Sequence, residues 1–191
     1  VPTVTHVALH AILDRRDSIP THDNADYPIA GVFGFGRGLI YRATIRGDET
    51  KYATLTPLHS GDVVYSKVNA FEGAITVVPP EGEGRFVSPE FPVFAVDDAV
   101  DPAYMRHVLA WDGFQAKVRA TSNGVGARRE RVNPATFLKL TVPLPDLPEQ
   151  RRIAAHLDKL TSAIQRGVSL AQPVDAKGLM REIAVAALAS M

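Results

Sequence analysis

The sequence predicts an α+β protein, with a mixed-sheet domain over residues 1–147 and a helical, coiled-coil-like arm over residues 148–191. Residues 55–94 contain three short strand patterns separated by turn residues. Residues 149–172 carry apolar side chains at steps of four and three, which is the spacing of a narrow coiled-coil seam. A chain of 191 residues, 46% apolar and 22% charged, can bury one core plus an appendage.

The composition narrows the class of protein. With no cysteine there is no disulfide framework and no thiolate metal site, and a reducing cytoplasm fits. No apolar run approaches the roughly 20 residues that span a bilayer, and the start lacks the layout of a signal peptide. The start also lacks an initiator methionine, which indicates processing or a piece of a longer protein.

Charge is balanced overall but unevenly distributed. The formal net charge is zero, which counts mildly against nucleic-acid binding. However, the charged residues within 81–101 are all acidic except Arg85, and those within 115–131 are all basic except Glu130. If these blocks fold onto different faces, one face is basic. Solvated loops of mixed sign are the alternative.

In the first 60 residues, a glycine-rich stretch is the clearest signal. Residues 5–13 fit either a strand or a short helix. Gly31, Gly34, Gly36 and Gly38 then alternate with aromatic residues, without the strand–turn–helix context or the ending of a phosphate loop, so they predict turns or bulges. Residues 40–45 alternate like a strand. The arginines there, Arg37, Arg42 and Arg46, are either edge-strand charges or contacts for a polyanion.

The central block predicts strands over residues 62–68, 73–78 and 91–96, which need a larger sheet around them. Lys67 lies at the end of the first strand, either exposed there or in contact with phosphate. A helix is expected from Pro102, with Asp101 as its N-cap, and a second short helix over residues 114–120.

Residues 120–144 form the second informative segment. Ser122, Asn123, Arg128, Arg129 and Arg131 combine hydroxyl, amide and guanidinium groups, which hold phosphodiesters and read guanine edges. Lys117 and Arg119 are candidates of second rank. A short helix is expected after residue 133, and a last strand over residues 140–144.

The arm is predicted as a helix over residues 149–172, broken at Pro173 and followed by a second helix over residues 175–189. Its seam needs a partner, which is its own second helix, another copy or another subunit. We favour a partner beyond the chain. The seam residues are Ile153, Leu157, Leu160, Ile164, Val168 (or its neighbour Gly167) and Ala171.

Several strings together resemble the specificity subunits of type I restriction–modification systems. They are GDVVYSKVNAFEGA (residues 61–74), VSPEFPVF (87–94), the arginine-rich stretch before residue 132, and FLKLTVPLPDLPEQRRIAAHLDKL (137–160). The resemblance implies a target recognition domain over residues 1–147 and a spacer or dimerisation arm over residues 148–191. This is about half of a full subunit, so the chain is either a fragment or a natural half-subunit.

The resemblance also implies a function. Such subunits are non-catalytic DNA readers in the cytoplasm that direct a methyltransferase subunit to double-stranded DNA. S-adenosylmethionine and ATP, if used, bind the partner subunits, and no metal or cofactor is expected on this chain. A homodimer or a second half-subunit would present two readers to a split site. The alternative is a protein-interaction module of a defence system that has lost DNA reading. A catalytic residue set is not visible in the sequence.

Overall fold

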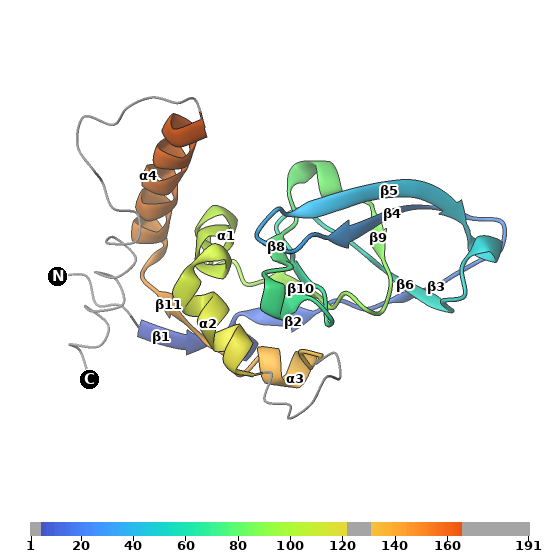
Figure 1. Cartoon of the computed structure of the whole chain (residues 1–191), viewed down its shortest axis with the longest axis horizontal. Coiled ribbons are helices and arrows are strands. Elements are labelled where there is room, and N and C mark those ends of the chain that lie inside the picture. The colour runs from blue at the N-terminus through green and yellow to red at the C-terminus, as the bar shows by residue number, and fades with distance from the viewer. Residues whose placement is uncertain (1–4, 122–130, 166–191) are drawn as a thin grey trace.

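Two sheets account for most of the domain in the computed structural model, which describes residues 5–121 and 131–165 (Figure 1). The four-stranded sheet has the order β2-β10-β7-β8, and the five-stranded sheet has the order β3-β6-β9-β4-β5. The four strands are β2 (Leu13–Arg15), β10 (Val93–Val96), β7 (Val63–Tyr65) and β8 (Ile75–Val77). The five strands are β3 (Ile19–Pro20), β6 (Thr54–Pro57), β9 (Phe86–Val87), β4 (Asp26–Val32) and β5 (Leu39–Arg46).

A strand pair, four α-helices and four short 3-10 turns complete the regular elements of the described chain. The pair joins the two ends of the domain, because β1 (Thr5–Ala8) runs antiparallel to β11 (Thr141–Leu144). The helices are α1 (Pro102–Ala110), α2 (Asp112–Ala120), α3 (Pro134–Phe137) and α4 (Leu147–Gln165). The mixed α+β class is therefore confirmed, since β4 pairs parallel with β9 while its other neighbour, β5, is antiparallel.

The central block forms three adjacent strands of one sheet, shorter than the sequence predicted. All three residues of β7 are buried: Val63 and Tyr65 face the larger hydrophobic core, and Val64 faces a smaller one against the five-stranded sheet. The period of two along this strand therefore separates two cores rather than core from solvent. The open choice for residues 5–13 is also resolved, as strand β1 followed by a single 3-10 turn over Leu9–Ala11.

The local sequence signals explain the caps of α1 and α3. Asp101 Oδ1 accepts a hydrogen bond from Tyr104 N (3.0 Å), and Asn133 Oδ1 accepts one from Ala135 N (2.9 Å). Each cap is followed by proline at the first helical position, where its fixed φ suits the helix. The predicted starts of these two helices are confirmed.

The first half of α4 belongs to the domain core, which corrects the expectation that the whole seam faces a partner beyond the chain. Ile153, Leu157 and Leu160 are buried in the same cluster as the apolar face of α1. Ile164 is 67% exposed, whereas Val168 and Ala171 lie outside the described residues. Apolar residues spaced three and four positions apart occur both in a helix that packs on its own domain and in a helix that packs on another chain, so the spacing does not distinguish the two. The division at 147/148 therefore remains a prediction.

Polar contacts fix α4 in this position. The side chain of Gln150 is buried, accepts from Asp101 N (2.8 Å) and donates to the carbonyl oxygens of Ala99 (3.0 Å) and Pro145 (2.9 Å). About two turns further along α4, Asp158 Oδ1 lies 2.7 Å from both Arg106 Nη2 and His107 Nε2 of α1. Within the described chain, no helix has the length and apolarity required to cross a bilayer.

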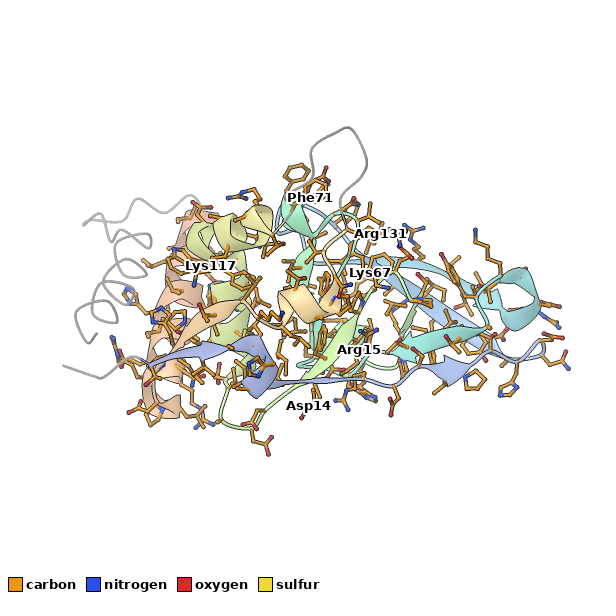
Figure 2. All side chains as sticks on the ribbon, turned by 90° about the horizontal axis from the view of Figure 1, so that it is seen from below. Asp14, Arg15, Lys67, Phe71, Lys117 and Arg131 are labelled. Carbon is orange, nitrogen blue, oxygen red and sulfur yellow. The ribbon has the colours of Figure 1, made fainter. Side chains whose placement is uncertain are left out.

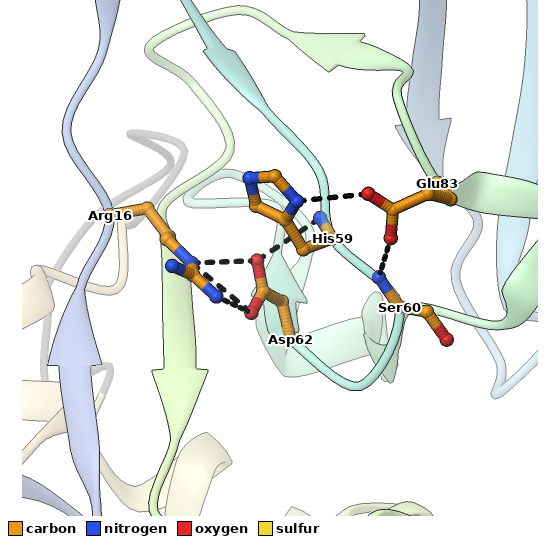
Figure 3. A network of polar contacts seen from close by, with 5 residues as sticks. All are labelled: Arg16, His59, Ser60, Asp62 and Glu83. Atoms are coloured by element: carbon orange, nitrogen blue, oxygen red, sulfur yellow. Dashed lines mark hydrogen bonds and ion pairs between the residues drawn. The ribbon is translucent and has the colours of Figure 1, made fainter.

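An ion pair between the half-buried Arg16 and the buried Asp62 closes the end of the four-stranded sheet near β2 (Figure 3). Arg16 holds Asp62 with two nitrogens, Nη2 2.9 Å from Oδ1 and Nε 3.0 Å from Oδ2, and His59 N donates to the same carboxylate (3.2 Å). Glu83 accepts from Ser60 N (2.6 Å) and lies 2.9 Å from His59 Nδ1. These contacts bind the residue after β2 and the turn before β7 into one unit.

Candidate nucleic-acid interface

The hairpin formed by β4 and β5 positions the first predicted cation, Arg42. The strand β5 lies at the edge of the five-stranded sheet, and Arg42 is exposed on it. Gly31 faces Ile40 across the hairpin. A Cβ added at Gly31 would lie 3.1 Å from Ile40 Cγ2, which is tighter than ordinary contact, and 3.7 Å from both Arg42 Nε and the Phe91 ring. Glycine therefore lets the two strands approach closely beside Arg42 and Phe91. Arg42, which the sequence analysis selected as a candidate contact, also lines a pocket of the structure.

Lys67, Glu90 and Arg131 meet although they are far apart in sequence. Lys67 N donates to Glu90 O (3.0 Å), and Val132 N donates to Lys67 O (2.8 Å). Arg131 holds the Glu90 carboxylate with both terminal nitrogens, Nη2 2.9 Å from Oε2 and Nη1 3.3 Å from Oε1. Figure 2 shows Lys67 and Arg131 close together beside the sheets. We call Arg42, Lys67 and Arg131 the basic cluster.

The buried Tyr65 anchors one side of this arrangement. Its hydroxyl donates to Val132 O (3.1 Å), and its ring stacks on Phe137 with centroids 4.4 Å apart. Burial raises the pKa of Tyr65 well above its usual range, so the hydroxyl stays protonated and keeps donating. The backbone that carries Arg131 is thereby tied to the core of the domain.

A pocket of about 350 Å³ lies between Arg42 and Glu90. Its walls combine apolar side chains with two aromatic residues and the hydroxyl groups of one threonine and two serines. The lining residues are Ile29, Ala30, Arg42, Ile45, Thr50, Tyr52, Leu55, Ser66, Val68, Ser88, Glu90 and Phe91. Hydroxyl groups and cations suit phosphate and sugar oxygens, and aromatic walls suit base faces.

The electrostatics of the basic cluster leave an excess of positive charge. Glu90 offsets one of its three cations. The side chains of Arg42 and Lys67 make no hydrogen bond or ion pair with another residue in the described ranges, whereas Arg131 is engaged only with Glu90. Arg131 remains 59% exposed. The cluster can therefore accept an anionic ligand without first losing a contact that holds the fold.

The structure places Arg37 and Arg119 elsewhere, around the tip of the β4–β5 hairpin. Arg37 stacks on Phe33, with its guanidinium carbon 4.3 Å from the ring centroid. Arg119 lines a separate pocket together with Phe35 and Gly36. The tip itself is a tight turn with three residues at positive φ, namely Phe35, Gly36 and Gly38, as the glycine pattern predicted. These two arginines therefore belong to a second surface.

Lys117 proves to be a structural residue, which corrects its place among the DNA contacts. Its Nζ donates to Thr141 O (2.8 Å) and Thr141 Oγ1 (3.0 Å) at the β1–β11 pair. Partial burial lowers its pKa. Figure 2 shows it among the helices, away from Lys67 and Arg131. The sequence alone could not distinguish Lys117 from the neighbouring cations as a structural residue. The spacing of residues along a helix does not show which distant segment, here the one with Thr141, packs against it.

Four predicted residues, Ser122, Asn123, Arg128 and Arg129, lie outside the described residues, so their assignment remains a prediction. Conversely, the sequence analysis did not include Tyr52, Ser66, Ser88, Glu90 or Phe91 among the site residues. A signal was available for all of them except Tyr52, because Ser66 lies within GDVVYSKVNAFEGA and the last three lie within VSPEF, two strings that supported the family resemblance. In the described part of the chain, no three His, Asp or Glu side chains gather as a metal site would require.

Comparisons with known proteins agree with this fold. A family described as the type I restriction modification DNA specificity domain matches residues 21–170. No curated protein matches the sequence. The HsdS subunit of Thermoanaerobacter tengcongensis superimposes with a TM-score of 0.71 at 23% identity, over 86% of this chain and 44% of that subunit.

Two further solved structures are similar. One, from work on complex assembly and conformational transition of the type I R-M system, has a TM-score of 0.72 at 20% identity, over 87% of this chain and 44% of that one. The S subunit of the type I restriction–modification system of M. genitalium has a TM-score of 0.55 at 13% identity, over 86% and 41%. These likenesses show the fold, and this chain spans less than half the length of each structure.

Proposed function

Because the chain belongs to the type I restriction–modification DNA specificity domain family, we propose that it reads a DNA sequence and directs a partner methyltransferase to it. The observation that carries the proposal is the basic cluster. Arg42, Lys67 and Arg131 come from three separate parts of the chain. Arg42 and Glu90 line one pocket with aromatic and hydroxyl walls, and Glu90 in turn pairs with Arg131 and accepts a backbone hydrogen bond from Lys67 N. Guanidinium and ammonium groups neutralise phosphates, and a planar guanidinium can hold a guanine edge with two hydrogen bonds.

Glu90 gives the pocket a way to discriminate between bases. Its carboxylate accepts hydrogen bonds, and an accepting carboxylate selects the amino group of cytosine. Arg131, which pairs with Glu90 at 2.9 Å, can turn to a phosphate or a guanine edge when the carboxylate is taken by a base. We propose that this pair is the element that converts general DNA affinity into sequence preference.

The chemistry belongs to other subunits in this proposal. Specificity-domain proteins are a non-catalytic kind of subunit, so S-adenosylmethionine and ATP would bind the methyltransferase and restriction partners. The chain would act in the cytoplasm, at the nucleoid. A second copy, or a second half-subunit, would supply the other reader, and the exposed Ile164 at the outer end of α4 marks where the remaining seam would meet it. The mass of the purified chain in solution tests this pairing.

The test of DNA reading is a selection from duplexes with a randomised central segment, followed by affinity measurements on the selected duplex. The triple variant Arg42→Ala, Lys67→Ala, Arg131→Ala should bind at least about 100-fold more weakly, because one base contact alone is worth about 1–3 kcal/mol. Arg151→Ala is the matched control, since Arg151 is an exposed arginine paired with Asp101 at the acidic end of the domain. Equal loss in both variants, or no selected sequence, would favour the protein-interaction alternative.

A further inference from the structure

A second pocket, of about 270 Å³, lies between the tip of the β4–β5 hairpin and the start of α2. We call it the Gln115 pocket. The loop at its mouth is held in place, because Phe35 N donates to Glu72 O (2.6 Å) and Gly36 N donates to Gly73 O (3.2 Å). Arg42, Lys67 and Arg131 do not line it. It is therefore a site separate from the basic cluster.

The side chain of Gln115 ends in an acceptor without a donor. Its Nε2 donates to Leu109 O (2.6 Å), which fixes the orientation of the amide. Its Oε1 is buried and accepts no hydrogen bond from the described part of the chain, although the residue is only 7% exposed. Leaving such an acceptor unsatisfied costs about 1–3 kcal/mol. A group that is kept at this cost points to a ligand that supplies the donor.

The space in front of this oxygen exists because residue 73 is glycine. A Cβ added at Gly73 would lie 3.6 Å from Gln115 Oε1 and 3.4 Å from Phe35 N. Gly73 also has φ of +79°, a conformation that glycine adopts without strain. The acceptor is thus aimed at the part of the pocket that a side chain would otherwise fill.

The charged residues that line the Gln115 pocket favour a positively charged ligand. Asp112 and Arg119 have opposite charges and each takes part in interactions of its own, so they offset each other. Glu72 remains, exposed at the rim, and forms no ion pair with another residue of the described ranges. A pocket with one surplus negative charge repels a phosphodiester and attracts a single positive group.

Phe35 supplies the third feature. It is 77% exposed and has φ of +60°, a conformation that is unfavourable for a residue with a side chain. Neither burial nor backbone geometry gives the fold a reason to keep phenylalanine at this position. An exposed ring beside an acceptor-lined pocket is a stacking surface for a flat cation.

We propose that the Gln115 pocket binds an arginine side chain of a partner polypeptide. The guanidinium would donate to Gln115 Oε1 and to the Glu72 carboxylate, and its plane would stack on Phe35. Arginine fits better than lysine because it offers several donors in one plane. It fits better than an extruded base because a base brings phosphates to an acidic rim and is too wide to reach a buried oxygen easily. This site goes beyond DNA reading, since it would dock a protein.

The test is an NMR titration of the isotope-labelled full chain with N-acetyl-arginine methylamide. We expect saturable shifts of the Gln115 side-chain amide and the Gly73 amide, with a dissociation constant of about 1–10 mM for so small a probe. The neutral, nearly isosteric citrulline derivative should bind at least ten times more weakly. Equal binding of citrulline, binding of deoxyadenosine or deoxycytidine instead, or no saturable shift would overturn the proposal.

Two variants show whether the pocket itself is responsible. Gly73→Ala fills the space before the oxygen and should abolish the shifts. Gly84→Ala is its matched control, because Gly84 has nearly the same φ of +73° but open space around its Cβ, so it shares the strain without blocking anything. Glu72→Gln, at an exposed position that should not affect folding, should weaken the arginine probe several-fold. Unchanged binding in Gly73→Ala and Glu72→Gln would also overturn the proposal. DNA is absent from this titration, so its failure leaves the DNA-reading function untouched.

Discussion

Two arginine–carboxylate pairs of this domain have similar geometry and opposite roles. Arg16 and Asp62 meet at 2.9 Å, with the carboxylate 2% exposed and also bonded to the backbone at His59. Arg131 and Glu90 also meet at 2.9 Å, but the arginine is 59% exposed and the carboxylate borders a pocket. The first pair fastens two segments of the fold to each other. The second holds its charges where a ligand can reach them.

The difference lies in burial, not in distance. A carboxylate removed from water depends on its partner, and losing that partner leaves an uncompensated charge. An exposed pair is worth little to stability because water and salt replace the partner. The same residue types can therefore serve the fold in one region and remain available for DNA in another, and stability and DNA affinity should respond to opposite sets of substitutions.

The largest effect on stability should come from Asp62→Ala. We expect the free energy of unfolding to fall by about 1–3 kcal/mol, because the substitution leaves the half-buried Arg16 side chain and the His59 amide without their acceptor. Urea denaturation monitored by circular dichroism measures the change. Glu90→Ala is the matched control and should change stability by no more than about 1 kcal/mol. Similar losses in the two variants would remove the distinction between the pairs.

Arg131→Ala should show the reverse pattern. Stability should stay within about 1 kcal/mol of the parent, while affinity for the selected duplex should fall by about 1–3 kcal/mol if Arg131 contacts a base. Glu90→Gln should strengthen binding to unrelated duplexes, because it removes the negative charge that offsets the cluster. Fluorescence anisotropy at fixed salt measures both. A weaker general affinity in Glu90→Gln would contradict the assigned role of the carboxylate.

Phe35→Gly tests whether an exposed side chain of the proposed arginine pocket contributes to folding stability. Removing an exposed side chain from a backbone at positive φ should stabilise the domain by about 0.5–1 kcal/mol. Thermal unfolding of this variant, compared with Tyr41→Gly on the neighbouring strand, measures the effect. Tyr41 is also an exposed aromatic residue, but it lies in regular strand geometry, so its substitution should destabilise. A destabilised Phe35→Gly variant would mean that the ring serves the fold.

The smallest expected effect concerns His107, whose side chain is more exposed than the Asp62 carboxylate and less exposed than Arg131. Burial lowers its pKa below the ordinary 6.5, and the hydrogen bond that its ring makes to the Asp158 carboxylate acts in the opposite direction. As the pH falls through about 6.5, the unfolded chain takes up the proton before the folded one, so folding stability should decrease, by about 1 kcal/mol or less. Melting temperatures between pH 8 and pH 5 measure this slope, which His107→Gln should reduce. An unchanged slope would assign it to other groups.

The sequence predicted features that depend on neighbouring residues. The proline after Asp101, the glycines of the hairpin tip and the alternation around residues 62–78 each determine backbone geometry within a few residues, and the structure contains the expected cap, turn and strands. Family strings, which combine many such positions, led to the correct family.

Features that depend on distant residues were predicted less well. Lys117 and Arg131 are both cations of the same basic block, and only the fold shows that Thr141 binds one and that Glu90 leaves the other exposed. The inner half of the α4 seam was assigned to a partner for the same reason, because its spacing does not reveal that α1 lies against Ile153 and Leu157. Whether a side chain serves the fold or a ligand is decided by long-range contacts.

The central claim is that the basic cluster binds the DNA backbone and bases, and the salt dependence of binding tests it most directly. The logarithm of the association constant should fall linearly with the logarithm of salt concentration, and the triple variant of Arg42, Lys67 and Arg131 should have a slope that is shallower by about 2–3. The Arg151→Ala variant should keep the parent slope. Parallel lines for the parent and the triple variant would contradict the account.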